Sequence, residues 1–434
     1  MKKLLYILAS AALLGSCTTS DYYDVTRFGA RGDGVTDDAA SIQKAIDRAS
    51  RCGGTVIFPA GKTFLSGPLE LKGNIEYRLE AGSVLLANPD ESIYKLSAFG
   101  ANEGEGMLWL WARDTRNISI CGTGAIDGNG VAFMGEELED SYDLKPVTTF
   151  DPRPHVLTFF GVEKLRIRDV TVRNGAYWTI HLVGCYDAVI SGVSLLNNLK
   201  IRNGDGIDID HSRKVRISDC FIESGDDCIC LKNRREWEQY GVCEDIVVTG
   251  CVMTSRSCAV KIGSENMDSI ANVLFDNCII RGGNRGIGIQ NRDEGTVHNV
   301  VFSNMYVESL LWSDVWWGKA EPIYVTSYPR ASANHKDANW RFPAGATEGA
   351  CGEVSGIWFK NIVCDASNGI FVGGDEPGKV HDIHFESVSL RYPGERAQVY
   401  DKRPCKGEGF VPADGQDYCF ETVSDIFIDG KKVK

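Results

Sequence analysis

The sequence predicts an all-β protein that winds as a single-stranded right-handed parallel β-helix. An apolar-x-apolar-x-x-apolar pattern recurs along the chain, turn residues such as Asn, Asp and Gly separate the copies, and no helical periodicity lies between them. Such repeats cannot bury their own apolar face, so they stack as coils of a solenoid. The last apolar residues of the successive copies are Val170, Val193, Cys220, Cys251, Cys278, Met305, Ile362 and Val388.

The spacing of these markers is 23 to 31 residues, except between Met305 and Ile362, where it is 57. A step of this length predicts two coils, one of which carries a loop insertion at about residues 310–352. Solenoids grow without splitting, so we expect one elongated domain over residues 25–434, with a C-terminal cap segment from about residue 390.

Cysteines occupy three successive marker positions, at Cys220, Cys251 and Cys278. We expect a ladder of free, buried thiols rather than a metal site, because residues in one column lie in a row and do not converge as a tetrahedron. Cys405 and Cys419 flank a Gly/Pro/Asp-rich segment and are the best candidates for a disulfide.

The composition fits a large globular chain: 43% of the 434 residues are hydrophobic. The formal net charge of -13 argues against nucleic acid as a partner but allows an anionic substrate, because steering depends on the local field of a cleft. We expect a monomer with no cofactor and no metal.

The N-terminus is expected to be an export signal. A basic start at Met1–Lys3 precedes an apolar run, Leu4–Leu14, that is too short to span a bilayer and ends before Cys17. The segment resembles a bacterial lipoprotein signal peptide over residues 1–17, with Cys17 lipidated and residues 18–24 as a tether; an ordinary cleavage site is the alternative. This predicts anchoring to the cell envelope, on the periplasmic or cell-surface face of the outer membrane.

A short helix is expected to cap the first coil. Apolar residues recur at helical spacing between Ala39 and Ala49, and Asp37 or Asp38 is suited to the N-cap. A helix in this place covers an otherwise exposed strand edge.

Two aspartate motifs suggest a catalytic site. Asn203-Gly204-Asp205 is followed, 21 residues after Asp205, by Gly225-Asp226-Asp227. Stacked coils lie ~4.8 Å apart, so the three carboxylates are expected on one small patch. A protonated acid opposite a base is what hydrolysis of a glycosidic bond requires, and mutual repulsion should keep one of the three protonated. Ordinary turns of the solenoid are the alternative.

Both motifs resemble those of glycoside hydrolase family 28, the polygalacturonase family, and the turn-rich segment from Phe28 to Asp38 is similar to the start of many pectin-active β-helix proteins. The resemblance covers roughly residues 25–390. It implies an inverting hydrolase in which Asp226 is the general acid and Asp205 and Asp227 hold the attacking water. Asn203 of the first motif is a candidate for substrate binding.

The chain departs from the family pattern in two places. The family usually carries Gly-His-Gly where this chain has Ser257-Cys258-Ala259, and Arg-Ile-Lys, which binds the substrate carboxylate, where it has Gly288-Ile289-Gln290. These changes indicate an altered substrate subsite. His211 is a weak candidate to replace the lost histidine.

Equal offsets from the marker cysteines predict a column of Asp227, Cys258 and Arg285, and a second column of Arg234, Glu265 and Arg292. Arg285 would then lie two coils, ~9.6 Å, from Asp227. The arginines, together with Lys232 and Lys261, could hold an anionic sugar, whereas the alternative is a ladder of surface charges without a role in binding.

Aromatic residues of the insertion are further candidates for substrate binding. Trp316, Trp317 and Tyr324 could stack on sugar rings, and Glu321 could bind sugar hydroxyls. The alternative is that they cover the apolar face under the loop.

The sequence thus favours a glycosidase acting on a pectic or related acidic polysaccharide. A β-helix polysaccharide lyase, with Ca²⁺ held by Asp205, Asp226 and Asp227, is one alternative. A non-catalytic glycan-binding protein is the other.

Overall fold

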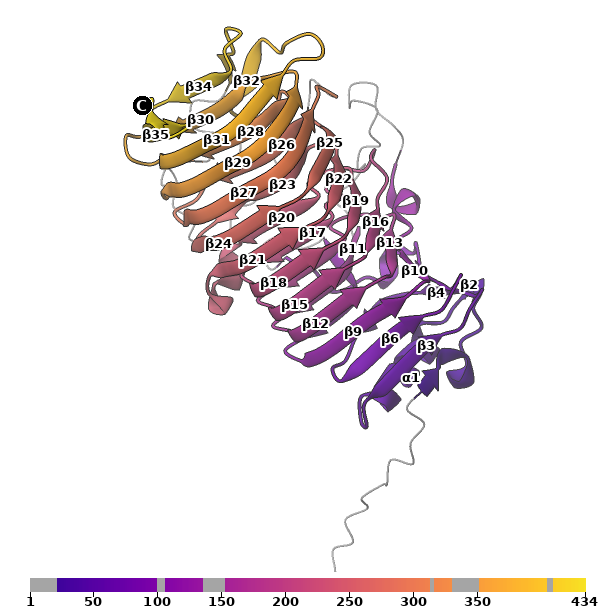
Figure 1. Ribbon diagram of the computed structural model, residues 1–434. Coiled ribbons are helices and arrows are strands. Elements are labelled where there is room, and N and C mark those ends of the chain that lie inside the picture. The colour runs from indigo at the N-terminus through magenta and orange to yellow at the C-terminus, as the bar shows by residue number, and fades with distance from the viewer. Residues whose placement is uncertain (1–21, 100–105, 136–152, 313–315, 330–350, 404–408) are drawn as a thin grey trace, which may run out of the picture.

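The protein is a parallel β-helix, as the sequence predicts (Figure 1). The computed structural model describes residues 22–99, 106–135, 153–312, 316–329, 351–403 and 409–434. The predicted signal peptide, Cys17 and most of the tether lie outside these residues. Among the described residues, no helix is both long and apolar enough to cross a membrane.

Each coil contributes strands to three parallel ladders. The first consists of β1 (Tyr22–Asp24), β3 (Gly54–Phe58), β6 (Ile75–Leu79), β9 (Arg116–Gly122), β12 (Glu163–Arg168), β15 (Tyr186–Ser191), β18 (Arg213–Ser218), β21 (Cys243–Thr249), β24 (Ser269–Asp276), β27 (Thr296–Ser309), β29 (Val354–Ala366), β31 (His381–Arg391) and β35 (Ser424–Ile428).

The second ladder joins the first through the long strand β27. It consists of β2 (Asp33–Asp37), β4 (Thr63–Ser66), β7 (Val84–Ala87), β10 (Ala125–Asp127), β13 (Thr171–Arg173), β16 (Ser194–Leu196), β19 (Phe221–Ser224), β22 (Val252–Ser255) and β25 (Ile279–Gly283).

The third ladder carries the two aspartate motifs at its edge. It consists of β5 (Leu69–Glu70), β8 (Met107–Arg113), β11 (Pro154–Phe160), β14 (Ile180–Val183), β17 (Ile207–Asp210), β20 (Ile229–Asn233), β23 (Cys258–Asn266), β26 (Arg285–Asn291), β28 (Glu321–Ser327), β30 (Ile370–Gly374) and β34 (Tyr418–Glu421).

A few short elements lie outside the three ladders or at their ends. They are the 3₁₀ turns η1 (Val25–Phe28), η2 (Glu91–Ile93), η3 (Gly130–Phe133) and η4 (Arg235–Tyr240), the antiparallel pair β32 (Val399–Asp401) and β33 (Phe410–Pro412), and β36 (Lys431–Lys432).

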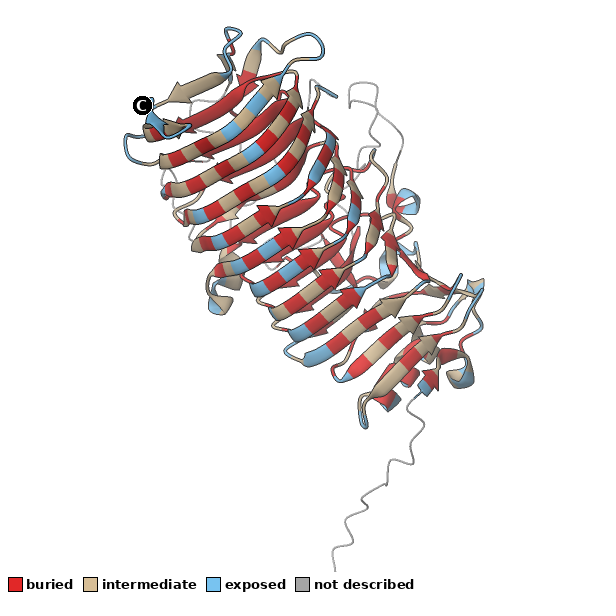
Figure 2. Ribbon diagram, viewed as in Figure 1, coloured by how far each residue is buried: buried red, intermediate tan, exposed pale blue. Residues whose placement is uncertain are grey.

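The core is a set of columns of buried side chains, visible as alternating buried and accessible positions along the strands (Figure 2). Phe275, Phe302, Phe359 and Phe385 form one such column, with successive ring centroids 5.3, 5.2 and 5.1 Å apart. The expected ladder of Cys220, Cys251 and Cys278 is confirmed, because these residues directly precede paired positions of β19, β22 and β25 and their thiols are free and buried.

The predicted capping helix is α1 (Ala39–Ala49), which packs against β1, β3 and β5 of the first coils. Asp38 stands at the N-cap, but its carboxylate accepts hydrogen bonds from the backbone of Arg31 and Gly32 instead of from the helix. The carboxylate of Asp37 accepts the N–H of Ala39, at 2.8 Å.

One expectation about the C-terminal part is wrong. The step of 57 residues is one coil, because β27 pairs directly with β29, so Met305 lies opposite Ile362. The insertion at about 310–352 is more than a loop, because it contains a regular strand, β28, whose side chains are buried on both faces. In the segment from about residue 390, β34 and β35 extend the third and first ladders, and β32–β33 and β35–β36 are antiparallel pairs. A capping role for this segment stays a prediction.

The predicted disulfide between Cys405 and Cys419 is also wrong. Cys419 carries a free thiol, and Cys405 lies outside the described residues.

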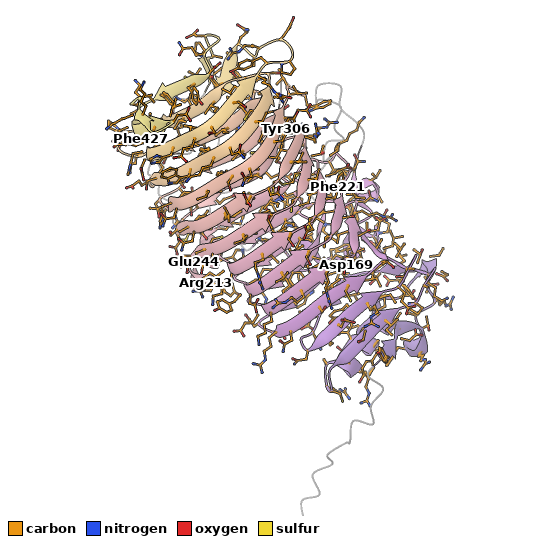
Figure 3. The ribbon with its side chains drawn as sticks, viewed as in Figure 1. Asp169, Arg213, Phe221, Glu244, Tyr306 and Phe427 are labelled. Carbon is orange, nitrogen blue, oxygen red and sulfur yellow. The ribbon has the colours of Figure 1, made fainter. Side chains whose placement is uncertain are left out.

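Outward side chains follow the same register as the core (Figure 3). Glu244 lies opposite Arg213 on neighbouring strands of the first ladder. Phe221 and Tyr306 occupy one outward row of the second ladder.

Candidate active site

The three aspartates of the two motifs meet at the edge of the third ladder. Asp205 and Asp227 precede β17 and β20 by two residues, and these strands pair with Ile207 opposite Ile229. Asp205 and Asp227 are therefore stacked, and Asp226 lies next to them. One carboxylate oxygen from each residue lies within 4.8 Å of the other two, so the expected patch is formed.

Glycines let the two turns approach each other. A Cβ atom on Gly225 would lie 2.2 Å from the carbonyl oxygen of Ile201, and one on Gly206 would lie 2.4 Å from that of Cys228. Any larger residue would push the turns apart, so these glycines bring the carboxylates together.

The backbone of the motifs is held by hydrogen bonds from hydroxyl and amide groups. Ser255 donates to the carbonyl oxygen of Asp226 at 2.5 Å, and the N–H of Asp226 donates to Ser224 Oγ at 3.1 Å. The N–H of Asn203 donates to Asp226 Oδ2 at 3.3 Å. Arg153, for which the sequence gives no signal, binds the Asn203 side chain from two coils away, at 3.3 Å.

Asp205, Asp226 and Asp227 are 3%, 6% and 1% exposed. Oδ1 of Asp205 and Oδ1 of Asp227 have no hydrogen-bond partner among the described residues. A buried carboxylate oxygen without a partner is costly, so these two atoms are the natural acceptors for a water molecule or a substrate hydroxyl.

Burial dominates the protonation of the cluster. It raises the pKa of Asp226 to about 6, with a further contribution from the charge of Asp227. Burial, followed by repulsion from Asp208 and Asp226, raises the pKa of Asp205 well above its ordinary value. At near-neutral pH the site can therefore hold a protonated carboxylic acid beside a carboxylate, as general acid catalysis requires.

Two lysines face the carboxylates. Lys261 Nζ lies 2.8 Å from Asp227 Oδ2. Lys232, which is 3% exposed, lies 3.5 Å from Asp208 Oδ1 and 3.7 Å from Glu265 Oε2. Burial alone would lower the pKa of Lys261, but the attraction of Asp227, together with that of Cys230 and Asp226, raises the pKa. Both lysines reach the site, and each is already paired with a carboxylate.

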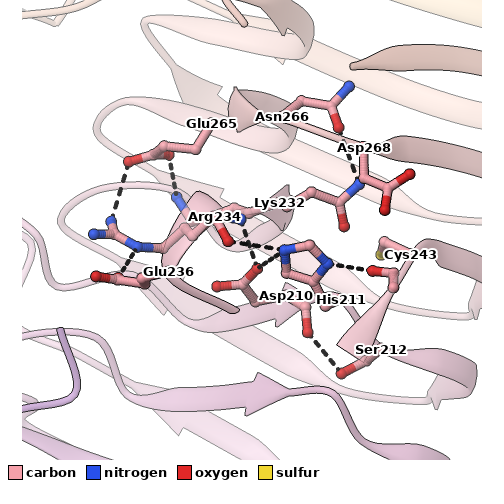
Figure 4. Close-up of polar contacts among 12 residues, drawn as sticks. Asp210, His211, Ser212, Lys232, Arg234, Glu236, Cys243, Glu265, Asn266 and Asp268 are labelled. Atoms are coloured by element: carbon pink, nitrogen blue, oxygen red, sulfur yellow. Dashed lines mark hydrogen bonds and ion pairs between the residues drawn. The ribbon is translucent and has the colours of Figure 1, made fainter. Parts of the chain in front are cut away.

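The second expected column is formed only in part (Figure 4). Arg234 donates to Glu236 at 2.7 Å and to Glu265 at 3.2 Å. Arg292 instead donates to Thr326 Oγ1 at 3.0 Å, although β23 and β26 keep the register expected from the column. Arg292 is 2% exposed and lies two strands beyond the aspartates, so it is not placed to bind substrate with them.

His211 does not replace the lost histidine. Its Nε2 lies 2.8 Å from the carbonyl oxygen of Arg234, and its Nδ1 lies at that of Gly241 (Figure 4). Both ring nitrogens are therefore engaged by backbone carbonyls that flank η4.

The column of Asp227, Cys258 and Arg285 is confirmed by the strand register, and it continues to Glu321. Arg285 Nε lies 3.3 Å from Glu321 Oε2, and its guanidinium lies 3.7 Å from the centre of the Tyr324 ring. Arg285 is 1% exposed and Glu321 and Tyr324 have no exposed surface. This burial argues against the substrate contacts expected of these three residues.

The tryptophans of the insertion lie beside the first motif. The guanidinium of Arg202 lies 5.3 Å from the Trp316 ring, and Trp316 and Trp317 are in contact, with ring centroids 5.6 Å apart. Arg202 directly precedes Asn203, so Trp316 contacts the turn that carries the first aspartate motif. The family pattern does not single out Arg202, and no periodic signal links it to the insertion.

The carboxylates of Asp205, Asp226 and Asp227 also form the one group among the described residues that is close enough to share a metal ion. Oxygen ligands of this kind suit Ca²⁺ or Mg²⁺. A cation there would compete with Lys261 for Asp227.

Comparisons with known proteins agree with this geometry. The family model "Glycosyl hydrolases family 28" matches residues 55–313. The chain is 27% identical over 362 residues to a "Probable polygalacturonase" of Vitis vinifera, covering 78% of this chain and 67% of that protein. It is 25% identical over 467 residues to an "Exo-poly-alpha-D-galacturonosidase" of Dickeya chrysanthemi, covering 94% and 74%.

A solved structure shares the fold. The family 28 exopolygalacturonase of Yersinia enterocolitica is 21% identical, with a TM-score of 0.68 over 95% of this chain and 79% of that chain. The family match includes both aspartate motifs and spans more than half of the chain. The chain therefore belongs to glycosyl hydrolases family 28 and is a glycosidase that hydrolyses O-glycosyl bonds.

Proposed function

We propose that this glycosidase cleaves a pectic or related acidic polysaccharide, with a substrate subsite that differs from that of ordinary polygalacturonases. The observation that carries the proposal is the buried cluster of Asp205, Asp226 and Asp227 flanked by Lys232 and Lys261. The relatives named as polygalacturonases support the substrate class.

Asp226 is the general acid in this proposal. Its raised pKa keeps a proton available for the leaving oxygen, and Asn203 fixes Oδ2 from one side. Asp205 and Asp227 hold the attacking water through their unpartnered Oδ1 atoms.

The altered subsite follows from Cys258, Gly288 and Gln290. Burial raises the pKa of the Cys258 thiol, so this residue stays neutral and cannot act like a histidine. Gly288 and Gln290 offer no charge where the family pattern has Arg and Lys.

The stereochemistry is proposed to be inverting, as the resemblance implies. The closest carboxylate oxygens lie within 4.8 Å, whereas inverting enzymes typically separate acid and base by ~6.5–9.5 Å. We keep the inverting assignment because two carboxylates, not one, can hold the attacking water. Proton NMR of the first product tests this: inversion of the anomeric configuration is expected, and retention would make Asp205 or Asp227 a nucleophile.

The test of function is incubation with a panel of pectic and other acidic polysaccharides, in which reducing ends and ultraviolet absorbance are measured together. New reducing ends without ultraviolet gain are expected, and Asp226→Asn should abolish them. Asp219→Asn is the matched control, because Asp219 lies in the same coil in a left-handed turn that Asn also adopts.

Ultraviolet gain would instead indicate a lyase, with the aspartates holding Ca²⁺ or substrate. Binding without any product would favour the glycan-binding alternative and contradict the proposal.

We also propose that the chain is exported and anchored through a lipid on Cys17, and that it acts as a monomer. The basic and apolar start of the sequence supports the anchor. Metabolic labelling with an alkyne fatty acid should mark the wild type but not Cys17→Ala, and labelling of both proteins would contradict the anchor.

A further inference from the structure

Two arginines from distant parts of the chain flank the tryptophan pair. The guanidinium of Arg202 lies 5.3 Å from the Trp316 ring, and that of Arg403 lies 5.8 Å from the Trp317 ring. Arg403 Nη2 also donates to the carbonyl oxygen of Trp316 at 3.4 Å. Arg202, Trp316, Trp317 and Arg403 thus form one continuous wall, which we call the Arg–Trp wall.

The Arg–Trp wall stands next to the general acid. Arg202 directly precedes Asn203, whose N–H donates to Asp226 Oδ2 at 3.3 Å. Arg153 fixes this turn, because its Nη1 donates to the carbonyl oxygen of Arg202 at 2.9 Å. A sugar bonded to the oxygen that Asp226 protonates would therefore have the wall beside it.

Buried charges brace the wall from behind. Asp401 accepts the N–H of Gly318 at 3.1 Å and the side chain of Arg403 at 2.9 Å. Glu321 accepts the N–H of Lys319 at 2.8 Å and that of Asp401 at 3.1 Å, and it pairs with Arg285. Paired, hydrogen-bonded charges of this kind hold a binding surface in one geometry.

The basic residues that lie closest to the three aspartates are already paired with carboxylates. Lys261 is paired with Asp227, and Lys232 with Asp208 and Glu265. The Arg403 side chain keeps 29% of its surface exposed although it contacts Asp401.

We propose that the Arg–Trp wall is a subsite for a carboxylate-bearing sugar on the leaving-group side of the scissile bond. A tryptophan face stacks on the sugar ring, and Arg202 and Arg403 bind the carboxylate. This proposal rests on the proposed function and specifies it, since it moves anion recognition from the family position at Gly288 and Gln290 to two arginines outside the family motifs.

The test uses calorimetric titration of galacturonate trisaccharide, and of its carboxyl-reduced counterpart, into the full chain carrying Asp226→Asn. In this background, Arg202→Gln and Arg403→Gln should each weaken binding of the anionic sugar by about 10- to 100-fold, the range for a hydrogen bond to a charged group. Binding of the neutral sugar should change little. Arg202→Lys and Arg403→Lys should recover part of the loss, which separates lost charge from misfolding.

Matched controls remove an arginine elsewhere. Arg216→Gln lies on the outer face of the first ladder, where the side chain is 63% exposed, and Arg396→Gln lies in the same C-terminal region as Arg403. Both controls should bind like the parent.

The subsite is overturned if the wall variants bind the anionic sugar as the parent does, if they lose both sugars equally, or if the parent binds no galacturonate trisaccharide. The proposed function fails separately, when the wild type releases reducing ends from no acidic polysaccharide. A wild type that cleaves such a polymer while the wall variants match the parent overturns the subsite alone.

Discussion

Lys261 Nζ lies 2.8 Å from Asp227 Oδ2, so a partly buried cation on one coil is paired with a carboxylate at the edge of the preceding coil. The pair gives the carboxylates of the cluster different electrostatic surroundings. Asp227 faces a positive charge, whereas burial and the charge of Asp227 raise the pKa of Asp226 to about 6. A base and an acid can therefore coexist in one small site.

Lys261→Met should lower kcat by at least about tenfold, because the carboxylate of Asp227, which is proposed to hold the attacking water, loses its partner. Steady-state kinetics at the pH of highest activity measure this effect. Lys360→Met removes a lysine whose pair with Glu386 is on the outer face, and it should leave kcat unchanged. An unchanged kcat in Lys261→Met would show that Lys261 does not support the base.

Activity should fall as the pH rises through about 6, since Asp226 must be protonated to act as an acid and its pKa is raised to about 6. The profile of kcat/KM against pH measures this limb. An aryl glycoside with an activated leaving group needs little proton donation, so the same limb should weaken or vanish with it. Persistence of the full limb with that substrate would assign it to another group.

Asp208 should make stability depend on pH. Burial raises its pKa to about 8, against the attraction of Lys232. A carboxyl group with a raised pKa in the folded state contributes stability that is fully present below its unfolded pKa of 3.8 and is lost as the pH rises through about 8. The melting temperature should therefore fall between mildly acidic and alkaline buffer.

Asp208→Asn should flatten this dependence and stabilise the protein in alkaline buffer by an amount on the order of 2 kcal/mol. Asp245→Asn, at an exposed position of β21, should leave the dependence as it is. Equal slopes in wild type and Asp208→Asn would remove Asp208 as the cause.

The coil repeat made part of the site predictable from the sequence. The column of Asp227, Cys258 and Arg285 could be counted from the marker cysteines, because parallel coils keep their register. The count gave the register of Arg292 but not its contact, because the side chain donates to Thr326 of the following coil.

Contacts between distant segments had no such signal. Asp401 and Arg403 lie over Glu321 and over the segment Trp316–Gly318. Asp401 follows Glu321 by 80 residues in the chain. Nothing periodic links these segments, so the burial of Arg285 and Glu321 could not be predicted. Asp208 could have been identified from the sequence, since it alternates with Ile207 and Ile209 on a strand next to Asp205.

The Arg285–Glu321 pair should contribute to stability and to substrate binding by different routes. Glu321 has no exposed surface and Arg285 is 1% exposed, so Glu321→Gln leaves a buried guanidinium without its anion. Breaking a buried pair in this way costs about 3–5 kcal/mol, whereas Glu386→Gln at the exposed pair with Lys360 should cost less than about 1 kcal/mol. Denaturant unfolding measures the difference.

Replacing both partners at once, with Arg285→Met and Glu321→Leu, should restore much of the lost stability, because no unpaired charge remains. The double variant should nevertheless keep a raised KM for an acidic polysaccharide, since Glu321 no longer holds the backbone N–H groups of Lys319 and Asp401 behind the Arg–Trp wall. Recovery of both stability and KM would mean that the pair stabilises the fold without positioning the wall.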